Sequence, residues 1–208
     1  MPVVLVHGFL VGPLSCVWLA RQLRRSGFQP HTFSYSTREE TLSDAAERLL
    51  AYGRRLQVNE LHWVGHSLGG LVILAMLEAA REHNVDLPPG RVVLLGSPVR
   101  GAAAAEGLAQ HPLGAWLLGQ AHGSLRQSFQ TAPIDRPTTA IRGTRSLGMG
   151  RWFEALPTPN DGTVAVAETA LEGAQCVDVP TTHAGLLLSP TVAKHVVAAL
   201  TSTASDGG

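Results

Sequence analysis

The chain has 208 residues, of which 45% are hydrophobic and only 15% are charged, a composition typical of one globular domain rather than a disordered chain. Sixteen basic residues balance sixteen acidic ones without forming a basic cluster, which argues against nucleic acid as a partner. No apolar stretch is long enough to span a bilayer, so we expect no stable membrane insertion.

The N-terminus leads straight into a predicted strand at residues 3–6, with no basic segment or cleavage site before it. We therefore expect a cytoplasmic protein. Cys16 and Cys176 are the only cysteines and lie far apart in the sequence. Two free thiols are expected, with a disulfide as the alternative, and we expect no metal site.

Short apolar runs alternate with helical patterns along the chain. This β-then-α alternation predicts a compact α/β fold, with a mostly parallel six-stranded sheet and helices on both of its faces. Strands are expected at residues 3–6, 30–35, 61–64, 91–95, 138–142 and 175–179, and helices at 15–25, 41–56, 68–83 and 190–200.

Residues 101–133 interrupt this alternation, since they separate two predicted strands and are rich in alanine and glycine. Such a segment is too long for a plain connection, so we expect a small helical cap or lid, with an ordinary pair of surface helices as the alternative. The sequence thus predicts a single domain over residues 1–200 that carries this insertion. A flexible tail is expected at residues 201–208.

The strongest chemical pattern, Gly65-His66-Ser67-Leu68-Gly69, lies between a predicted strand and a predicted helix. A serine on such a sharp turn adopts strained backbone angles, and glycines two positions away on either side avoid collisions there. The turn lifts the hydroxyl of Ser67 clear of the backbone, and the helix behind it directs N–H groups toward developing negative charge. This pattern predicts a nucleophilic serine that cleaves or transfers acyl groups.

A serine hydroxyl is a weak nucleophile, so it needs a base within reach and an acid that orients the base. In enzymes with a serine on this kind of turn, the acid follows a late strand and the histidine follows the last strand. Asp161 lies in the loop after the predicted strand at 138–142, and His183 follows the predicted strand at 175–179. We therefore predict that Ser67, His183 and Asp161 form the catalytic set.

Other assignments of the acid and the base are open. Asn160-Asp161-Gly162 is also good turn chemistry, so the aspartate could merely shape its loop. Asp178, within the last predicted strand, and Asp135, before its strand, are rival acids. Of the nine histidines, His66 is expected to pack or hydrogen-bond locally rather than act as the base.

Acyl transfer also needs two N–H donors aimed at the carbonyl oxygen as it becomes negative. The residue after the nucleophile, Leu68, is expected to provide one of them. The loop after the first strand, His7-Gly8-Phe9-Leu10, is expected to provide the other from Phe9, with Leu10 as the alternative. His7 is expected to brace this loop.

From residue 3 to residue 200, the chain resembles the small bacterial lipases and esterases of the α/β-hydrolase superfamily. The resemblance implies an α/β-hydrolase fold, ester hydrolysis through an acyl-serine and no cofactor. It also implies Ser67 as nucleophile, His183 as base and Asp161 as acid, with oxyanion donors at Phe9 and Leu68. The matching segments are His7-Gly8-Phe9, the serine pattern with Gly70, Leu95-Gly96-Ser97-Pro98-Val99-Arg100-Gly101, Asp161-Gly162-Thr163-Val164 and His183-Ala184-Gly185-Leu186-Leu187.

We therefore predict a serine carboxylic-ester hydrolase whose substrate is a small-molecule ester or a lipid. Apolar residues expected near the site favour an uncharged acyl chain, and Leu10, Trp116, Leu186 and Leu187 are the predicted substrate contacts. One alternative is an acyltransferase or lipid-remodelling enzyme that uses the same three catalytic residues. Another is a non-catalytic ligand binder on the same scaffold.

Overall fold

The computed structural model describes residues 1–9, 11–101, 123, 128–133, 135–146 and 156–202. Six strands within these residues form one open sheet in the order β2-β1-β3-β4-β5-β6, and the neighbouring strands all run parallel. The strands are β1 (Pro2–Val6), β2 (Gln29–Phe33), β3 (His62–His66), β4 (Val92–Leu95), β5 (Thr138–Gly143) and β6 (Gln175–Val179). The predicted α/β fold class is confirmed, with a wholly parallel sheet where the sequence predicted a mostly parallel one.

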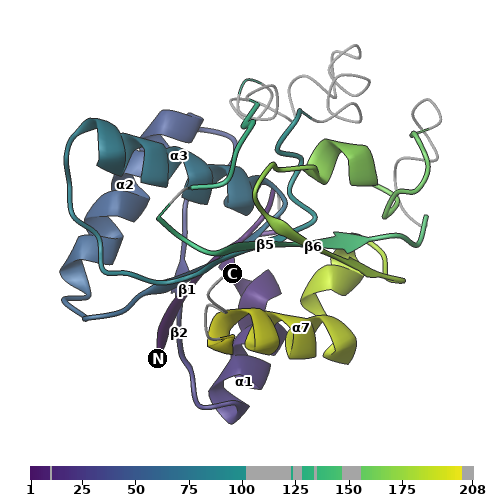
Figure 1. Ribbon diagram of the computed structural model, residues 1–208, viewed down its shortest axis with the longest axis horizontal. Coiled ribbons are helices and arrows are strands. Elements are labelled where there is room, and N and C mark those ends of the chain that lie inside the picture. The colour runs from purple at the N-terminus through teal and green to yellow at the C-terminus, as the bar shows by residue number, and fades with distance from the viewer. Residues whose placement is uncertain (10, 102–122, 124–127, 134, 147–155, 203–208) are drawn as a thin grey trace, which may run out of the picture.

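Helices cover both faces of this sheet (Figure 1). Helices α2 (Leu42–Arg55) and α3 (Leu68–Glu82) pack together over one face, while α1 (Val17–Arg25) and α7 (Pro190–Thr201) pack together over the other. Neighbouring residues of β3 point to opposite faces, so Trp63 enters the α2–α3 layer and Val64 enters the α1–α7 layer. Because both faces are buried, the central strands β1 and β4 are continuous apolar runs in the sequence.

Local chemistry determines where two of these helices begin. At the start of α2, the hydroxyl of Thr41 accepts the N–H of Asp44 at 3.1 Å, and the carboxylate of Asp44 accepts the N–H of Thr41 at 3.2 Å. This reciprocal pair is a capping box, which satisfies two N–H groups that the helix itself leaves free. Helix α7 begins at Pro190, and the hydroxyl of Ser189 accepts the N–H of Val192 at 3.4 Å.

The predicted helices and strands are all present, with boundaries within two residues of those expected. Strand β2 ends at Phe33 rather than at residue 35, and a 3-10 turn over Pro13–Cys16 precedes α1. Most of the predicted cap at 101–133 and residues 203–208 of the predicted tail lie outside the described residues. Among the residues that are described, no helix combines the length and apolar character needed to cross a bilayer.

Candidate active site

Ser67 lies between the end of β3 and the first residue of α3, on the predicted sharp turn. Its φ of 53° and ψ of −124° are rare for a residue with a side chain, so the turn holds the backbone under strain. Glycines make the turn possible, because a Cβ at Gly65 would lie 2.6 Å from Cα of Gly70 and one at Gly69 would collide with the carbonyl of Val6. The tight contacts on both sides fix the position of the serine.

Two backbone segments bring N–H groups next to this serine. Leu68 is the first residue of α3, and the first N–H groups of a helix have no acceptor within the helix. The loop after β1 also lies close to the serine, since a Cβ at Gly8 would lie 3.0 Å from Cβ of Ser67. Phe9 follows in that loop and packs against the α2–α3 layer. The two predicted oxyanion donors, Phe9 and Leu68, therefore both belong to segments that adjoin the serine.

His7 supports the loop after β1 from within the core, where it is 1% exposed. Its Nδ1–H donates to the carbonyl of Gly8 at 2.9 Å, and its ring stacks on Tyr35 with 4.7 Å between the centroids. The hydroxyl of Tyr35 donates in turn to the carbonyl of His7 at 3.0 Å. Burial lowers the pKa of His7, which keeps the ring neutral. These contacts brace the loop.

Asp161 lies in the loop between β5 and β6 and is 1% exposed. One carboxylate oxygen, Oδ1, accepts the N–H groups of Thr163 at 2.9 Å and Val164 at 2.8 Å. The other, Oδ2, accepts the Nδ1–H of His183 at 2.6 Å. The sequence left open whether Asp161 shapes its loop or orients the histidine. In the structure one carboxylate oxygen accepts hydrogen bonds from the loop and the other accepts one from His183.

His183 follows β6 and is held at three of its own atoms. Its ring Nδ1 and its backbone N–H both donate to Asp161, the latter to the carbonyl oxygen at 2.9 Å. Its carbonyl oxygen lies 3.1 Å from Nε2 of His66. Because Nδ1–H points at the carboxylate, Nε2 on the opposite side of the ring is the nitrogen left to accept a proton.

His66, the middle residue of the serine pattern, connects the serine turn to the histidine loop. Its ring centroid lies 4.7 Å from that of His183, with a tilt of 44° between the ring planes. Burial, reinforced by the neighbouring His183, lowers the pKa of His66 to about 3. His66 is packed in the interior, and its hydrogen-bond partner lies 117 positions along the chain.

Gly96, directly after β4, adjoins the aspartate–histidine pair although the sequence marked it only as part of a matching segment. A Cβ at this position would lie 3.0 Å from Oδ2 of Asp161 and 3.2 Å from Nδ1 of His183. Its φ of 56° is also one that glycine adopts most readily. In the sequence, this position was distinguished only by a glycine directly after an apolar strand.

The predicted substrate contacts fall into two groups. Leu10 and Trp116 lie outside the described residues. Leu186 and Leu187 lie in the 3-10 turn Ala184–Leu187, where they are 0% and 5% exposed and belong to the core of the α1–α7 layer. They anchor the histidine loop to the core and offer little surface to a substrate.

The rival acids are both engaged by arginines. Asp178 on β6 accepts Nε–H of Arg142 at 2.6 Å, and Asp135 forms an ion pair with Arg136 at 3.3 Å. Both side chains are at least half exposed, at 50% and 73%, in contrast to the buried Asp161. Their positions do not support a role as the orienting acid.

The cysteines are free, as predicted, with Cys16 buried and Cys176 exposed. In the part of the chain that the structure describes, no three side chains of histidine, cysteine, aspartate or glutamate are grouped so that they could hold a metal ion.

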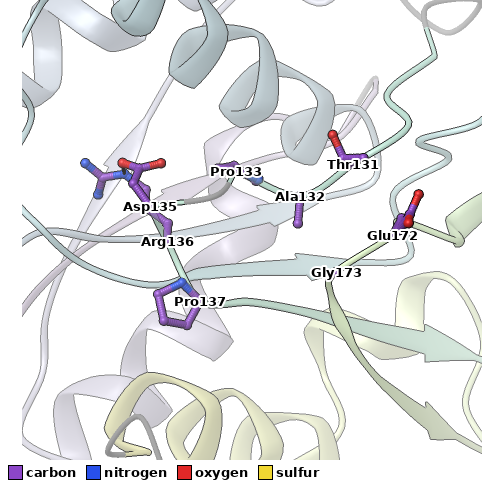
Figure 2. A pocket seen from close by; sticks show the side chains of 8 residues that line it. All are labelled: Thr131, Ala132, Pro133, Asp135, Arg136, Pro137, Glu172 and Gly173. Atoms are coloured by element: carbon purple, nitrogen blue, oxygen red, sulfur yellow. Dashed lines mark ion pairs between the residues drawn. The ribbon is translucent and has the colours of Figure 1, made fainter. Parts of the chain in front are cut away.

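A pocket of about 570 Å³ lies near the amino ends of β5 and β6 (Figure 2). Ser67 and His183, in contrast, follow the carboxyl ends of their strands. Arg136 in the pocket wall donates to the carbonyl oxygens of Pro88 at 2.9 Å and Leu87 at 3.3 Å, so its guanidinium ties two loops together. The pocket is lined by Thr131, Ala132, Pro133, Asp135, Arg136, Pro137, Glu172 and Gly173. Ligands of open parallel sheets bind beyond the carboxyl ends of the strands, which is the edge where Ser67 lies.

Comparison with solved structures shows the same fold in several hydrolases. The mature lipase BlEst2 of Bacillus licheniformis is 19% identical, with a TM-score of 0.72 over 94% of this chain and 91% of that one. Carboxylesterase CesB of Bacillus subtilis is 19% identical, with a TM-score of 0.60 over 96% and 83% of the two chains. The RedJ thioesterase of the prodiginine pathway in Streptomyces coelicolor is 14% identical, with a TM-score of 0.63 over 96% and 90%.

No curated protein matches the sequence. The model of the α/β-hydrolase family, in contrast, matches residues 3–204, nearly the whole chain. The wholly parallel sheet and the serine on a strand-to-helix turn are the features expected of that fold. This chain therefore belongs to the α/β-hydrolase family.

Proposed function

We propose that the protein is a serine hydrolase that cleaves carboxylic esters through an acyl-serine intermediate. Ser67 is the nucleophile, His183 the general base and Asp161 the acid that orients it. One arrangement carries the proposal. Ser67 is held at a φ of 53°, and the ring of the residue before it, His66, is hydrogen-bonded to the backbone of His183. The ring of His183 in turn donates a hydrogen bond to the buried carboxylate of Asp161 at 2.6 Å.

Acylation begins when the hydroxyl oxygen of Ser67 attacks the ester carbonyl. Nε2 of His183 takes the hydroxyl proton, and the carbonyl electron pair moves to oxygen to give a tetrahedral oxyanion. The intermediate collapses, the bond to the alkoxy group breaks, and the imidazolium of His183 gives its proton to the departing alcohol. Asp161 holds the ring in the required tautomer and stabilises its positive charge.

Deacylation repeats these steps with water in place of the serine. Nε2 of His183 takes a proton from the water, the hydroxide attacks the acyl-serine, and the collapsing intermediate releases the carboxylic acid. The proton on His183 returns to the oxygen of Ser67, which restores the starting state.

The oxyanion formed in both halves of the reaction needs N–H donors placed in advance. We assign these to the backbone of Leu68, at the start of α3, and of Phe9, in the loop that adjoins Ser67. Loss of one such donor typically raises the barrier by about 3 kcal/mol. Because both donors are backbone groups, the loop conformation supported by His7 and Tyr35 matters more here than the side chain of Phe9.

An assay with p-nitrophenyl esters of short to medium acyl length tests the proposal, run beside thioesters of the same acids. Family membership supports a hydrolase, and solved relatives of the same fold include a lipase, a carboxylesterase and a thioesterase. We expect Ser67→Ala to abolish turnover and Ser97→Ala to retain it. Ser97 is a matched control, because it is buried after the neighbouring strand and its hydroxyl has no partner among the described residues.

A fluorophosphonate probe supplies a second readout that does not depend on guessing the acyl chain. We expect it to label the wild-type protein at Ser67 and to leave the Ser67→Ala variant unlabelled. Absence of labelling in the folded wild-type protein would favour a non-catalytic binder and contradict the proposal. Addition of an alcohol during turnover shows whether water or an alcohol accepts the acyl group. A predominant ester product in dilute alcohol would indicate acyl transfer instead of hydrolysis.

A further inference from the structure

His66 occupies the space between two loops that meet at the proposed site. It is the last residue of β3 and is 4% exposed. On one side, its Nε2 lies 3.1 Å from the carbonyl oxygen of His183. On the other side, its Nδ1 would lie 2.9 Å from a Cβ at Gly8, so this nitrogen faces the loop after β1. The ring therefore contacts both the histidine loop and the loop expected to supply an oxyanion donor.

The chemistry of this contact fixes the protonation of the ring. A carbonyl oxygen can only accept a hydrogen bond, so Nε2 of His66 carries the proton. Nδ1 is then the bare nitrogen, and it has no hydrogen-bond partner among the described residues. A second proton on Nδ1 would place a buried charge beside the ring of His183, which agrees with the lowered pKa. His66 is therefore a neutral donor rather than a second base.

The hydrogen bond from His66 differs in kind from the other three that hold His183. Two of those are made with Asp161, so they fix the base relative to the acid but not relative to the nucleophile. The third, from the N–H of Leu186 to the carbonyl of His183 at 3.3 Å, lies within the histidine loop itself. His66 is covalently joined to Ser67, and its ring bonds the backbone of the residue that carries the base. A shift of the histidine loop away from the serine must therefore stretch this bond.

We propose that His66 is a positioning residue, whose Nε2–H bond to the carbonyl of His183 sets the distance between base and nucleophile. This inference rests on the proposed function, because it assumes that Ser67 and His183 react together. Misplacement of a reacting group by about 1 Å can cost about 100-fold in rate. Loss of the bond should therefore lower kcat and leave KM nearly unchanged, since the ring is not expected to touch the substrate.

Three substitutions test the bond. His66→Gln places an amide N–H at nearly the reach of Nε2, whereas His66→Asn has a side chain one methylene shorter, and His66→Leu fills the space without a donor. We expect His66→Leu and His66→Asn to lower kcat by about 10- to 100-fold with KM changed less than about threefold. His66→Gln should recover most of kcat. Thermal unfolding of each variant reports on folding. If His66→Leu does not fold, the comparison of kcat between His66→Gln and His66→Asn still tests the bond.

The outcomes distinguish this inference from the proposed function. Equal losses of kcat in His66→Gln and His66→Asn, or a rise in KM that accounts for the whole loss, would overturn the positioning role. So would wild-type kcat in a folded His66→Leu variant. In each of these cases labelling of wild-type Ser67 by fluorophosphonate would still support the hydrolase. A folded wild-type protein that is neither labelled nor active would instead overturn the proposed function and, with it, this role of His66.

Discussion

A single methyl group added at Gly96 should damage the proposed site although all three residues proposed for catalysis stay unchanged. In Gly96→Ala, the new Cβ would lie 2.6 Å from Cδ1 of Leu186, 3.0 Å from Oδ2 of Asp161 and 3.2 Å from Nδ1 of His183. Real Cβ atoms do not approach heavy atoms as closely as 2.6 Å, so the end of the Leu186 side chain must move. The contacts with Asp161 and His183 are also tighter than ordinary van der Waals contact, so this pair must give way by a few tenths of an ångström.

Two costs add up in this variant. Alanine in the left-handed region costs about 1–2 kcal/mol relative to its usual conformations, and Gly96 has a φ of 56°. Overpacking of a filled core typically costs about 1–3 kcal/mol. We therefore expect the free energy of unfolding to fall by about 2–5 kcal/mol. Displacement of the histidine by a few tenths of an ångström should lower kcat severalfold, short of the about 100-fold that a shift of about 1 Å can cost.

Gly27→Ala is the matched control for the backbone part of this cost. Gly27 has a φ of 86°, and a Cβ there would have nothing within 4 Å. Urea unfolding of the two variants should show a loss of about 1–2 kcal/mol in Gly27→Ala and a larger loss in Gly96→Ala. Turnover of the best p-nitrophenyl ester should fall in Gly96→Ala alone. The reasoning is refuted if a folded Gly96→Ala keeps kcat within twofold of wild type, or if both variants lose activity equally.

Asp161→Asn should lower kcat by up to about 10,000-fold with little change in KM, because an amide in place of the carboxylate favours the wrong tautomer of His183. A loss of kcat below tenfold would contradict the assignment of Asp161 as the orienting acid. The unfolded chain protonates a histidine near pH 6.5, whereas folding lowers the pKa of His66 to about 3. The free energy of unfolding should therefore fall as pH drops from 6.5 toward 3, by up to about 1.4 kcal/mol per pH unit for this group. Urea unfolding across that range should show a shallower slope in His66→Gln, and an unchanged slope would contradict the assignment. Thr41→Ala should remove the capping box of α2 and cost about 1 kcal/mol in thermal unfolding, with kcat unchanged.

The alternation of buried runs and amphipathic segments was enough to predict the fold class. Strands buried on both faces need continuous apolar residues, and β4 (Val92–Leu95) has them throughout. The start of α2 depends on a similarly local pattern, because Thr41 and Asp44 of its capping box lie three positions apart. These features depend on residues close together in the sequence, which is why their positions came out within two residues.

The sequence also predicts the residues proposed for catalysis, because each combines an uncommon chemistry with a required place after a strand, and the structure brings Asp161 and His183 into contact. Ser67 needed its flanking glycines, and Asp161 and His183 needed to follow late strands. Their supporting contacts could not be predicted in the same way. The bond from His66 to His183 spans 117 positions, and spacing along the chain contains no information on such a pair.

The way these loops are held explains why their supports were hard to find in the sequence. The backbone N–H of His183 donates to the carbonyl of Asp161, and the carbonyl of His183 accepts from His66. A bond to a backbone atom constrains the path of the chain but requires no particular side chain at the residue that it reaches, since every residue has a carbonyl. The specific requirement falls instead on the donor ring of His66 and on positions such as Gly96, where the path of the loop leaves no room for a side chain. Activity should therefore depend on these two positions, though less strongly than on the residues proposed for catalysis, whereas substitutions of exposed side chains in the same loops should have little effect.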